Sequence, residues 1–166
     1  MGMIGKYARV TPTQLDRALG EPVWALEHAY RLAEGEGAVG AGGEPWYLDI
    51  DKSWWALGVL LDRAAGETPA NPFLGGEVLG DLDWGQGPAR FLSPASTAEA
   101  AATLAGLPFA RLAEHFDADD LNAEGIYPRS WHEGDQDGYL RPNYQAVTTL
   151  FAGAAGAGDA VLLWVD

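Results

Sequence analysis

The stretch Ala160-Val161-Leu162-Leu163-Trp164-Val165 is an unbroken apolar run. A run of this kind is typical of a strand that is buried within a sheet. Before it, Tyr144, Val147, Phe151 and Ala154 recur at helical spacing, which predicts a helix over residues 142–157. We therefore expect a helix that leads into a buried closing strand.

Residues 3–10 predict an earlier strand, and Thr11-Pro12 is a helix-start signal. The Gly20-Glu21-Pro22 triplet should break this helix and let a second one begin. Helical spacing alone predicts which residues of the second helix lie on its inward, packed face. These residues are Val23, Leu26, Tyr30 and Ala33.

A strand over residues 46–50 is followed by Asp51 at a helix N-cap position and by an apolar helix over residues 52–61. Because nearly every face of this helix is apolar, it is expected to be buried. Its predicted packing residues are Trp54, Leu57 and Leu61 on one side, with Trp55 and Val59 partly covered on another.

Residues 66–88 are rich in Gly, Pro and Asp and predict a long irregular connection. Residues 89–92 predict a strand, and Ser93-Pro94 predicts a capped helix to about residue 104. Two shorter helices are expected, one within residues 107–116 and one capped by Asp117.

Residues 35–40 match a dinucleotide-binding glycine fingerprint in form only. That fingerprint needs a strand before the glycines and a helix after them, whereas a helix precedes them here and Gly42-Gly43-Glu44-Pro45 follows. The favoured interpretation is a flexible connecting loop.

Strands separated by groups of helices favour an α+β fold over a regular βαβ array. No repeat and no sharp change in composition divides the chain, so residues 1–166 are expected to form a single domain. We expect a mixed or antiparallel sheet packed against several helices.

Composition limits the possible partners. The 24 acidic residues outnumber the 10 basic ones, for a net charge of −14, so a nucleic acid would be repelled. Solubility is the favoured explanation of the acidity, and attraction to a basic protein is the alternative. The absence of cysteine and of an apolar membrane segment favours the cytoplasm.

Four blocks resemble the YfbM-like bacterial family of unknown function. They are residues 1–10 (MGMIGKYARV), 48–54 (LDIDKSW), 85–94 (GQGPARFLSP) and 158–164 (GDAVLLW). Because they span nearly the whole chain, the resemblance implies a bacterial, cytoplasmic α+β domain. It supplies no reaction, cofactor or catalytic residue.

Asp49 and Asp51 would project to one side of an extended segment, as a divalent-metal or acid/base pair does. The favoured interpretation is structural, with Asp51 as a helix cap and Asp49 as a hydrogen-bond acceptor. Arg90 follows a glycine-rich loop and suits an anionic ligand, although an ion pair with one of the many acids is favoured.

Most aromatic residues are expected to lie in the core. Trp84, Trp131 and Tyr139 fall in irregular, polar stretches and are the candidates for a surface site. No metal or cofactor is expected, because His28, His115 and His132 lack paired ligand spacing and cysteine is absent.

Two functions follow as hypotheses. A non-enzymatic module that binds a protein or small ligand is slightly favoured, because no catalytic constellation is recognisable. The alternative is a small-molecule enzyme or ligand-binding domain with a site around Asp49, Asp51 and Arg90.

Overall fold

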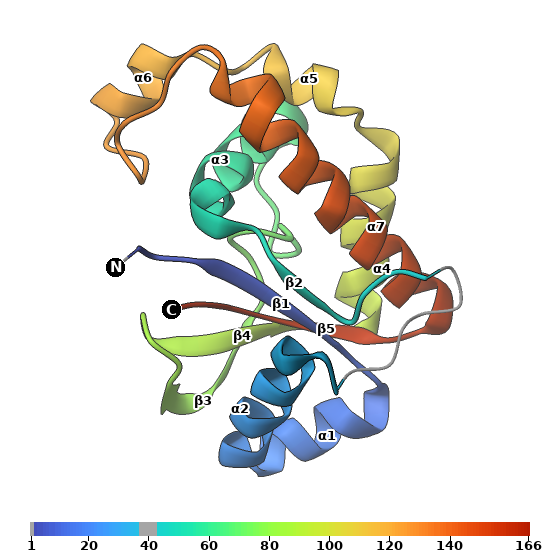
Figure 1. Cartoon of the computed structure of the whole chain (residues 1–166). Helices are drawn as coiled ribbons and strands as arrows, with labels where there is room; N and C mark the ends of the chain where they lie inside the picture. The colour runs from blue at the N-terminus through green and yellow to red at the C-terminus, as the bar shows by residue number, and fades with distance from the viewer. Residues whose placement is uncertain (1, 37–42) are drawn as a thin grey trace.

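The computed structural model describes residues 2–36 and 43–166. In these residues, one antiparallel sheet with the strand order β2-β1-β5-β4-β3 lies between two layers of helices, which confirms the α+β fold (Figure 1). The strands are β1 (Gly5–Val10), β2 (Tyr47–Asp49), β3 (Glu77–Asp83), β4 (Pro88–Leu92) and β5 (Ala160–Val165).

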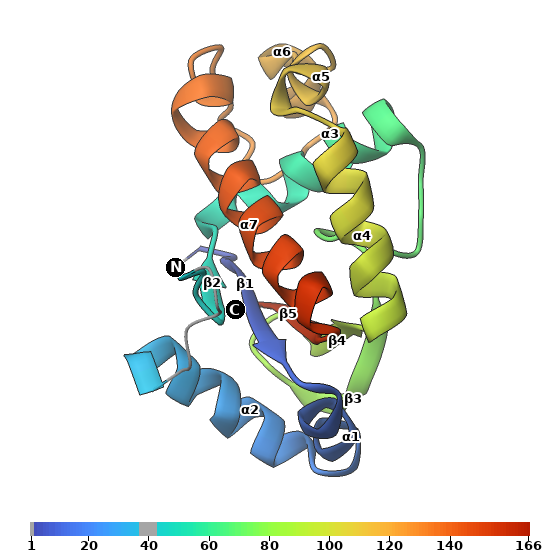
Figure 2. The same cartoon turned by 90° about the vertical axis from the view of Figure 1, so that its right-hand side faces the viewer.

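The two layers differ in size. The lower layer contains α1 and α2, and the upper layer contains the others, with α4 and α7 packed side by side (Figures 1 and 2). The helices are α1 (Pro12–Gly20), α2 (Pro22–Arg31), α3 (Trp54–Ala65), α4 (Pro94–Gly106), α5 (Phe109–Ala113), α6 (Ala118–Ala123) and α7 (Arg141–Ala157).

The predicted closing strand β5 is the middle strand of the sheet, between β1 and β4. Val161 and Leu163 pack into the upper core, whereas Leu162 and Trp164 pack into the lower core. Both faces of β5 are therefore covered, which explains why its sequence is apolar at every position rather than at alternate ones.

The predicted break between the first two helices is confirmed. Thr11 and Gln14 form a reciprocal capping box at the start of α1, and Pro22 opens α2. The predicted inward stripe is wrong: Val23 and Tyr30 are exposed, as is Ala33, and Leu26 is only partly buried. The small residues Ala25 and Ala29 face the sheet instead. Their size lets the helix axis lie close to the strands.

The predicted buried helix is confirmed as α3, which buries Leu57, Leu60 and Leu61. Its start differs from the prediction, because Asp51 does not cap it. A 3-10 turn over Asp51–Ser53 leads into the helix, and Asp51 has a positive φ of 50°. Ser93 and Asp117 do cap α4 and α6 as predicted, each accepting a backbone N–H bond.

The prediction of an irregular connection over residues 66–88 is wrong for its second half, which forms β3. This strand lies at an edge of the sheet and has an irregular register with β4 between Val78 and Asp83. Leu79 is its one fully buried residue, so its sequence shows no alternating apolar signal. Most of the glycine fingerprint at residues 35–40 lies outside the described residues.

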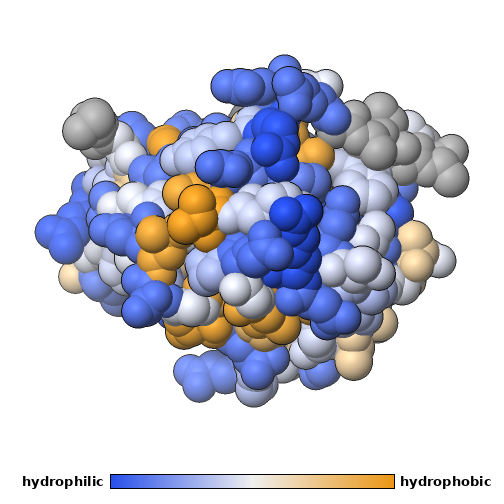
Figure 3. All heavy atoms as spheres, turned by 90° about the horizontal axis from the view of Figure 1, so that it is seen from below, coloured by the Kyte–Doolittle hydropathy of each residue, from blue (hydrophilic) through white to orange (hydrophobic). Residues whose placement is uncertain are grey.

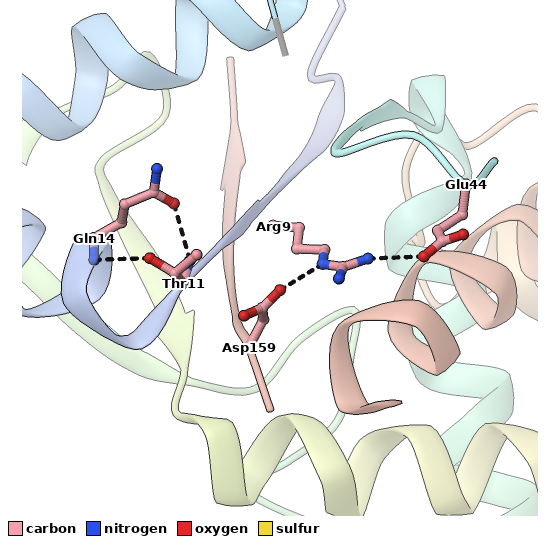
Figure 4. A network of polar contacts seen from close by, with 5 residues as sticks. All are labelled: Arg9, Thr11, Gln14, Glu44 and Asp159. Carbon is pink, nitrogen blue, oxygen red and sulfur yellow. Dashed lines mark hydrogen bonds and ion pairs between the residues drawn. The ribbon is translucent and has the colours of Figure 1, made fainter. Parts of the chain in front are cut away.

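A buried ion-pair network joins β1 to the start of β5 (Figure 4). The Arg9 guanidinium donates to Asp159 at 2.7 Å and to Glu44 at 2.9 Å, and it lies over the ring of Trp46. Arg9 and Asp159 are only 4% and 5% exposed. The guanidinium of Arg9 thus links β1 to the residues that precede β2 and β5.

Within residues 2–36 and 43–166, no helix has the length and apolar character needed to cross a bilayer.

Candidate functional site

A cavity of about 600 Å³ lies between the upper face of the sheet, the start of α3 and the segment before β3. Its lining is mainly apolar. The residues that line it are Met3, Gly5, Lys6, Tyr7, Trp54, Phe73, Leu74, Val78, Gln86, Pro88, Arg90, Leu163, Trp164 and Val165.

One wall of the cavity is formed by Trp54, at the first turn of α3. Its indole N–H donates to the carbonyl of Met3 at 3.1 Å, and its ring stacks on Trp55. Gly5 makes this position possible, because a Cβ there would lie only 2.7 Å from the Cβ of Trp54. A glycine in β1 therefore sets how closely Trp54 approaches the sheet.

Another part of the wall is formed by Leu74, in the segment that precedes β3. Leu74 packs directly over the backbone of Gly58, where a Cβ would lie 2.3 Å from the Leu74 Cγ. The buried side chain of Asn71 holds the segment in place: its amide donates to the Gly58 carbonyl and to Asp62, and its oxygen accepts from the backbone N–H groups of Phe73 and Leu74.

The floor of the cavity includes Tyr7 of β1. Its hydroxyl donates to the carbonyl of Pro72 at 2.9 Å, and burial raises its pKa far above the ordinary tyrosine value. Tyr7 thus stays protonated at physiological pH. Its hydroxyl is a fixed hydrogen-bond donor that joins the sheet to the wall segment, residues 71–74.

Arg90 of β4 reaches the cavity mouth, where it is exposed to solvent. One of its terminal nitrogens donates to the carbonyl of Leu74. Among the described residues, no carboxylate lies within ion-pair distance of its guanidinium. The favoured prediction of an ion pair at Arg90 is therefore not met in this part of the chain.

The other cation at the cavity, Lys6, is neutralised. Its ammonium lies 2.7 Å from one carboxylate oxygen of Asp166 and 2.8 Å from the other. Partial burial lowers the pKa of Lys6, but the hydrogen bond and the nearby acids outweigh it and raise the pKa overall. Of the two cations that line the cavity, Lys6 is paired and Arg90 is therefore the one available to bind an anionic ligand.

The sequence candidates Asp49, Asp51 and Tyr139 come together elsewhere. The backbone N–H of Asp51 donates to Asp49 at 2.7 Å, and the Tyr139 hydroxyl donates to Asp51 at 2.9 Å. The same hydroxyl accepts from the backbone N–H of Lys52. Burial and the hydrogen bond to Asp51 raise the pKa of Tyr139. Asp49 is a structural acceptor, as favoured, and Asp51 is a partner of Tyr139.

Arg90 does not join this group. The sheet register runs from Arg90 through Leu163 and Tyr7 to Leu48, so three strand spacings, or about 14 Å, separate the backbones of β4 and β2. Asp49 follows Leu48 and therefore projects from the opposite face of the sheet. The structure does not form a single site from Asp49, Asp51 and Arg90.

Two of the aromatic candidates lie in the core rather than at the surface. Trp84 is 2% exposed and packs edge-on against Trp164, and Trp131 is 4% exposed with its indole bonded to the carbonyl of Ile126. The polar residues beside them in the sequence led to the wrong prediction, whereas Trp84 belongs to the lower core and Trp131 to the upper core.

The cavity walls were not identified from the sequence, which predicted Trp54 only as a packing residue. The usable signal lies in Gly5 and Gly58, since a glycine within a strand or helix often marks a close approach by another group. Which group approaches depends on contacts between distant segments, such as Gly5 with Trp54.

A second apolar area lies on the underside of the molecule, where α1 and α2 are found. Figure 3 shows apolar spheres between hydrophilic ones on this face. Leu19, Val23 and Tyr30 are the exposed large apolar residues of these two helices.

In residues 2–36 and 43–166, no group of three or more His, Asp or Glu side chains is placed to hold a metal ion.

Comparison with known proteins places the chain in a family. A family model described as "Domain of unknown function (DUF1877)" matches residues 1–164. The crystal structure of YfbM, a protein of unknown function from Escherichia coli, is similar with a TM-score of 0.71 at 20% identity, over 99% of this chain and 100% of that one. No curated protein matches. The chain therefore belongs to the DUF1877 family of domains of unknown function, which confirms the resemblance to YfbM-like proteins.

Proposed function

We propose that this protein is a binding module for a small organic molecule, which enters the cavity beside Trp54, Leu74 and Arg90. The observation that carries the proposal is an open cavity of about 600 Å³ with mainly apolar walls. Ligand sites typically have volumes of about 300–1,000 Å³, apolar linings and a few polar groups at defined positions. The cavity has these properties.

Hydrogen bonds within the protein hold the walls of the cavity in place. Asn71 fixes the segment that carries Leu74, and the hydrogen bond to Met3 fixes Trp54. A preformed site loses little conformational entropy when a ligand binds, so its apolar area contributes efficiently to affinity. The rigid walls therefore support a ligand-binding role for this cavity rather than an accidental depression in the surface.

A larger side chain at Val78 would fill the cavity mouth. Val78 lines the cavity and is 59% exposed, whereas Val23 on α2 is 60% exposed and lies on the other side of the sheet. We propose to compare Val78→Phe with Val23→Phe. Both variants add the same ring at an exposed position, but only the first one occupies the cavity mouth.

The test is thermal unfolding with a panel of indole, naphthalene and octanol. A ligand at a hundredfold excess over its Kd should raise Tm by about 5 °C or more in the native protein and in Val23→Phe. Val78→Phe should lose that shift while it keeps the native circular dichroism. The proposal is wrong if no probe binds the native protein or if Val78→Phe responds as the native protein does.

We further propose that residues 1–166 act as one domain in a bacterial cytoplasm. The absence of cysteine supports a reducing compartment, and the sheet that lies between the two cores and contributes residues to both supports one domain. The enzyme hypothesis based on Asp49, Asp51 and Arg90 has no such support, because Arg90 lies in β4, whereas Asp49 lies in β2 and Asp51 in the turn that follows β2.

A further inference from the structure

We propose that the ligand is an amphipathic monocarboxylate, whose carboxylate pairs with Arg90 while its apolar body lies against Trp54 and Leu74. This inference rests on the proposed function and identifies the chemical class of the ligand. Its starting point is the charge balance of the chain, which has 24 acidic and 10 basic residues.

In such an acidic protein, a cation readily finds a carboxylate. Six of the basic residues do so among the described residues, namely Lys6, Arg9, Arg17, Arg63, Arg111 and Arg141. Arg31, Lys52, Arg90 and Arg129 make no ion pair in that part of the chain, and of these four Arg90 is the one that lines the apolar cavity. An anion in the cavity would supply the missing charge.

The geometry of Arg90 suits a carboxylate. The bond to the Leu74 carbonyl uses Nη1, and no hydrogen bond from Nε or Nη2 to another described residue is present. The Nε–Nη2 edge presents two parallel N–H donors, which match the two oxygens of a carboxylate in a bidentate pair. The bond to Leu74 also orients the guanidinium beside the cavity wall.

A single negative charge fits better than two. The ammonium of Lys6 is already paired with Asp166, so the lining provides one available cation for an anionic head group. A phosphate dianion would keep one uncompensated charge within a protein of net charge −14. Beyond Arg90, the walls formed by Val78, Leu163 and Val165 are apolar and favour an aliphatic or aromatic body.

The test is calorimetric titration with octanoate, octanamide and octyl phosphate, which share one apolar chain and differ in the head group. The native protein should bind octanoate at least about tenfold more tightly than octanamide, the discrimination that roughly 1.4 kcal/mol provides. Arg90→Gln should lose this preference and bind octanamide as before. Arg90→Lys should keep part of the preference as a point charge without the bidentate edge.

Arg129→Gln is the matched control. Arg129 is an exposed arginine that also donates to a backbone carbonyl, that of Gly125, but it does not line the cavity. This variant removes the same charge from the protein and should keep the preference for octanoate.

The outcomes separate the two proposals. Equal affinity of the native protein for octanoate and octanamide, or a preference that survives in Arg90→Gln, overturns the carboxylate inference and leaves small-molecule binding intact. Tightest binding of octyl phosphate overturns it in favour of a phosphate ligand. Failure of all three compounds to bind overturns the carboxylate inference, and it overturns both proposals if indole, naphthalene and octanol also leave the Tm of the native protein unchanged. Binding that persists in Val78→Phe overturns the choice of cavity.

Discussion

The Nε of Arg9 and the Oδ2 of Asp159 lie 2.7 Å apart although 150 positions separate them in the sequence. Both side chains are buried, and Glu44 provides the second carboxylate of the network. Because burial of a charge is costly unless it is paired, each member of this network depends on the others.

Arg9→Met should therefore lower the free energy of unfolding by about 3–5 kcal/mol, since it removes the cation that pairs with the buried carboxylate of Asp159. Arg17→Met is the control, because the Arg17–Glu21 pair is exposed and should contribute less than about 1 kcal/mol. Urea titration measures both values. Equal losses in the two variants would show that the buried network has no special role.

Gly5→Ala should lower the free energy of unfolding by about 1–3 kcal/mol, because the new methyl group would overlap Trp54. It should also weaken ligand binding, since Trp54 must move. Gly156→Ala is the matched change at an unobstructed position within α7, and it should raise stability by about 0.5–1 kcal/mol. Opposite signs in urea titration are the expected result, and matching signs would contradict the close contact.

Asn71→Ala should lower the free energy of unfolding by more than about 2 kcal/mol, because it leaves the backbone N–H groups of Phe73 and Leu74 without an acceptor. The wall segment should also exchange its amide hydrogens faster, as hydrogen-exchange mass spectrometry can measure. Asn143→Ala removes a single bond to the Tyr139 carbonyl and should cost less than about 1.5 kcal/mol. An Asn71→Ala variant with native exchange would contradict this role.

Alkaline pH should destabilise the protein through Tyr144. Burial raises the pKa of Tyr144 from 10 to about 12, so the folded state holds the phenol proton more tightly than the unfolded chain does. Its contribution is complete below pH 10 and is lost as pH rises toward 12. Tyr7 and Tyr139, whose pKa values are also raised, act in the same direction.

Tyr144→Phe should accordingly show a weaker fall in unfolding free energy across that pH window. Tyr30→Phe is the control, because it removes the same hydroxyl from an exposed position. Urea titrations at several alkaline pH values make the comparison. An identical pH profile for Tyr144→Phe and the native protein would rule out the linkage.

Much of the fold was predictable because its signals are local. The Thr11-Pro12 helix start, the Pro22 restart and the Ser93 cap each depend on residues within one helical turn, and each lies where the sequence predicts it. The edge strand β3 was not predictable, because an edge strand with an irregular register buries few residues and shows no alternation.

The candidate site was predictable only in part. Arg90 lines the cavity, whereas Asp49 and Asp51, the residues expected beside it, lie in β2 and in the turn that follows β2. Strand order decides such distances, and strand order depends on which segments pair over long sequence separations. The burial of Trp84 and Trp131 has the same origin, since distant segments cover them.

The apolar run at residues 160–165 separates what the sequence determines from what only the tertiary structure decides. The sequence by itself determined that residues 160–165 form a buried strand, because their uniform apolarity is stable only if both faces are covered. Only the tertiary structure decided that this strand is central, that Leu163 and Val165 line a cavity, and that Arg90 meets the cavity without a described acid beside it. Hydrophobic burial is encoded residue by residue, whereas a cavity exists only where segments far apart in the chain fail to fill the space between them.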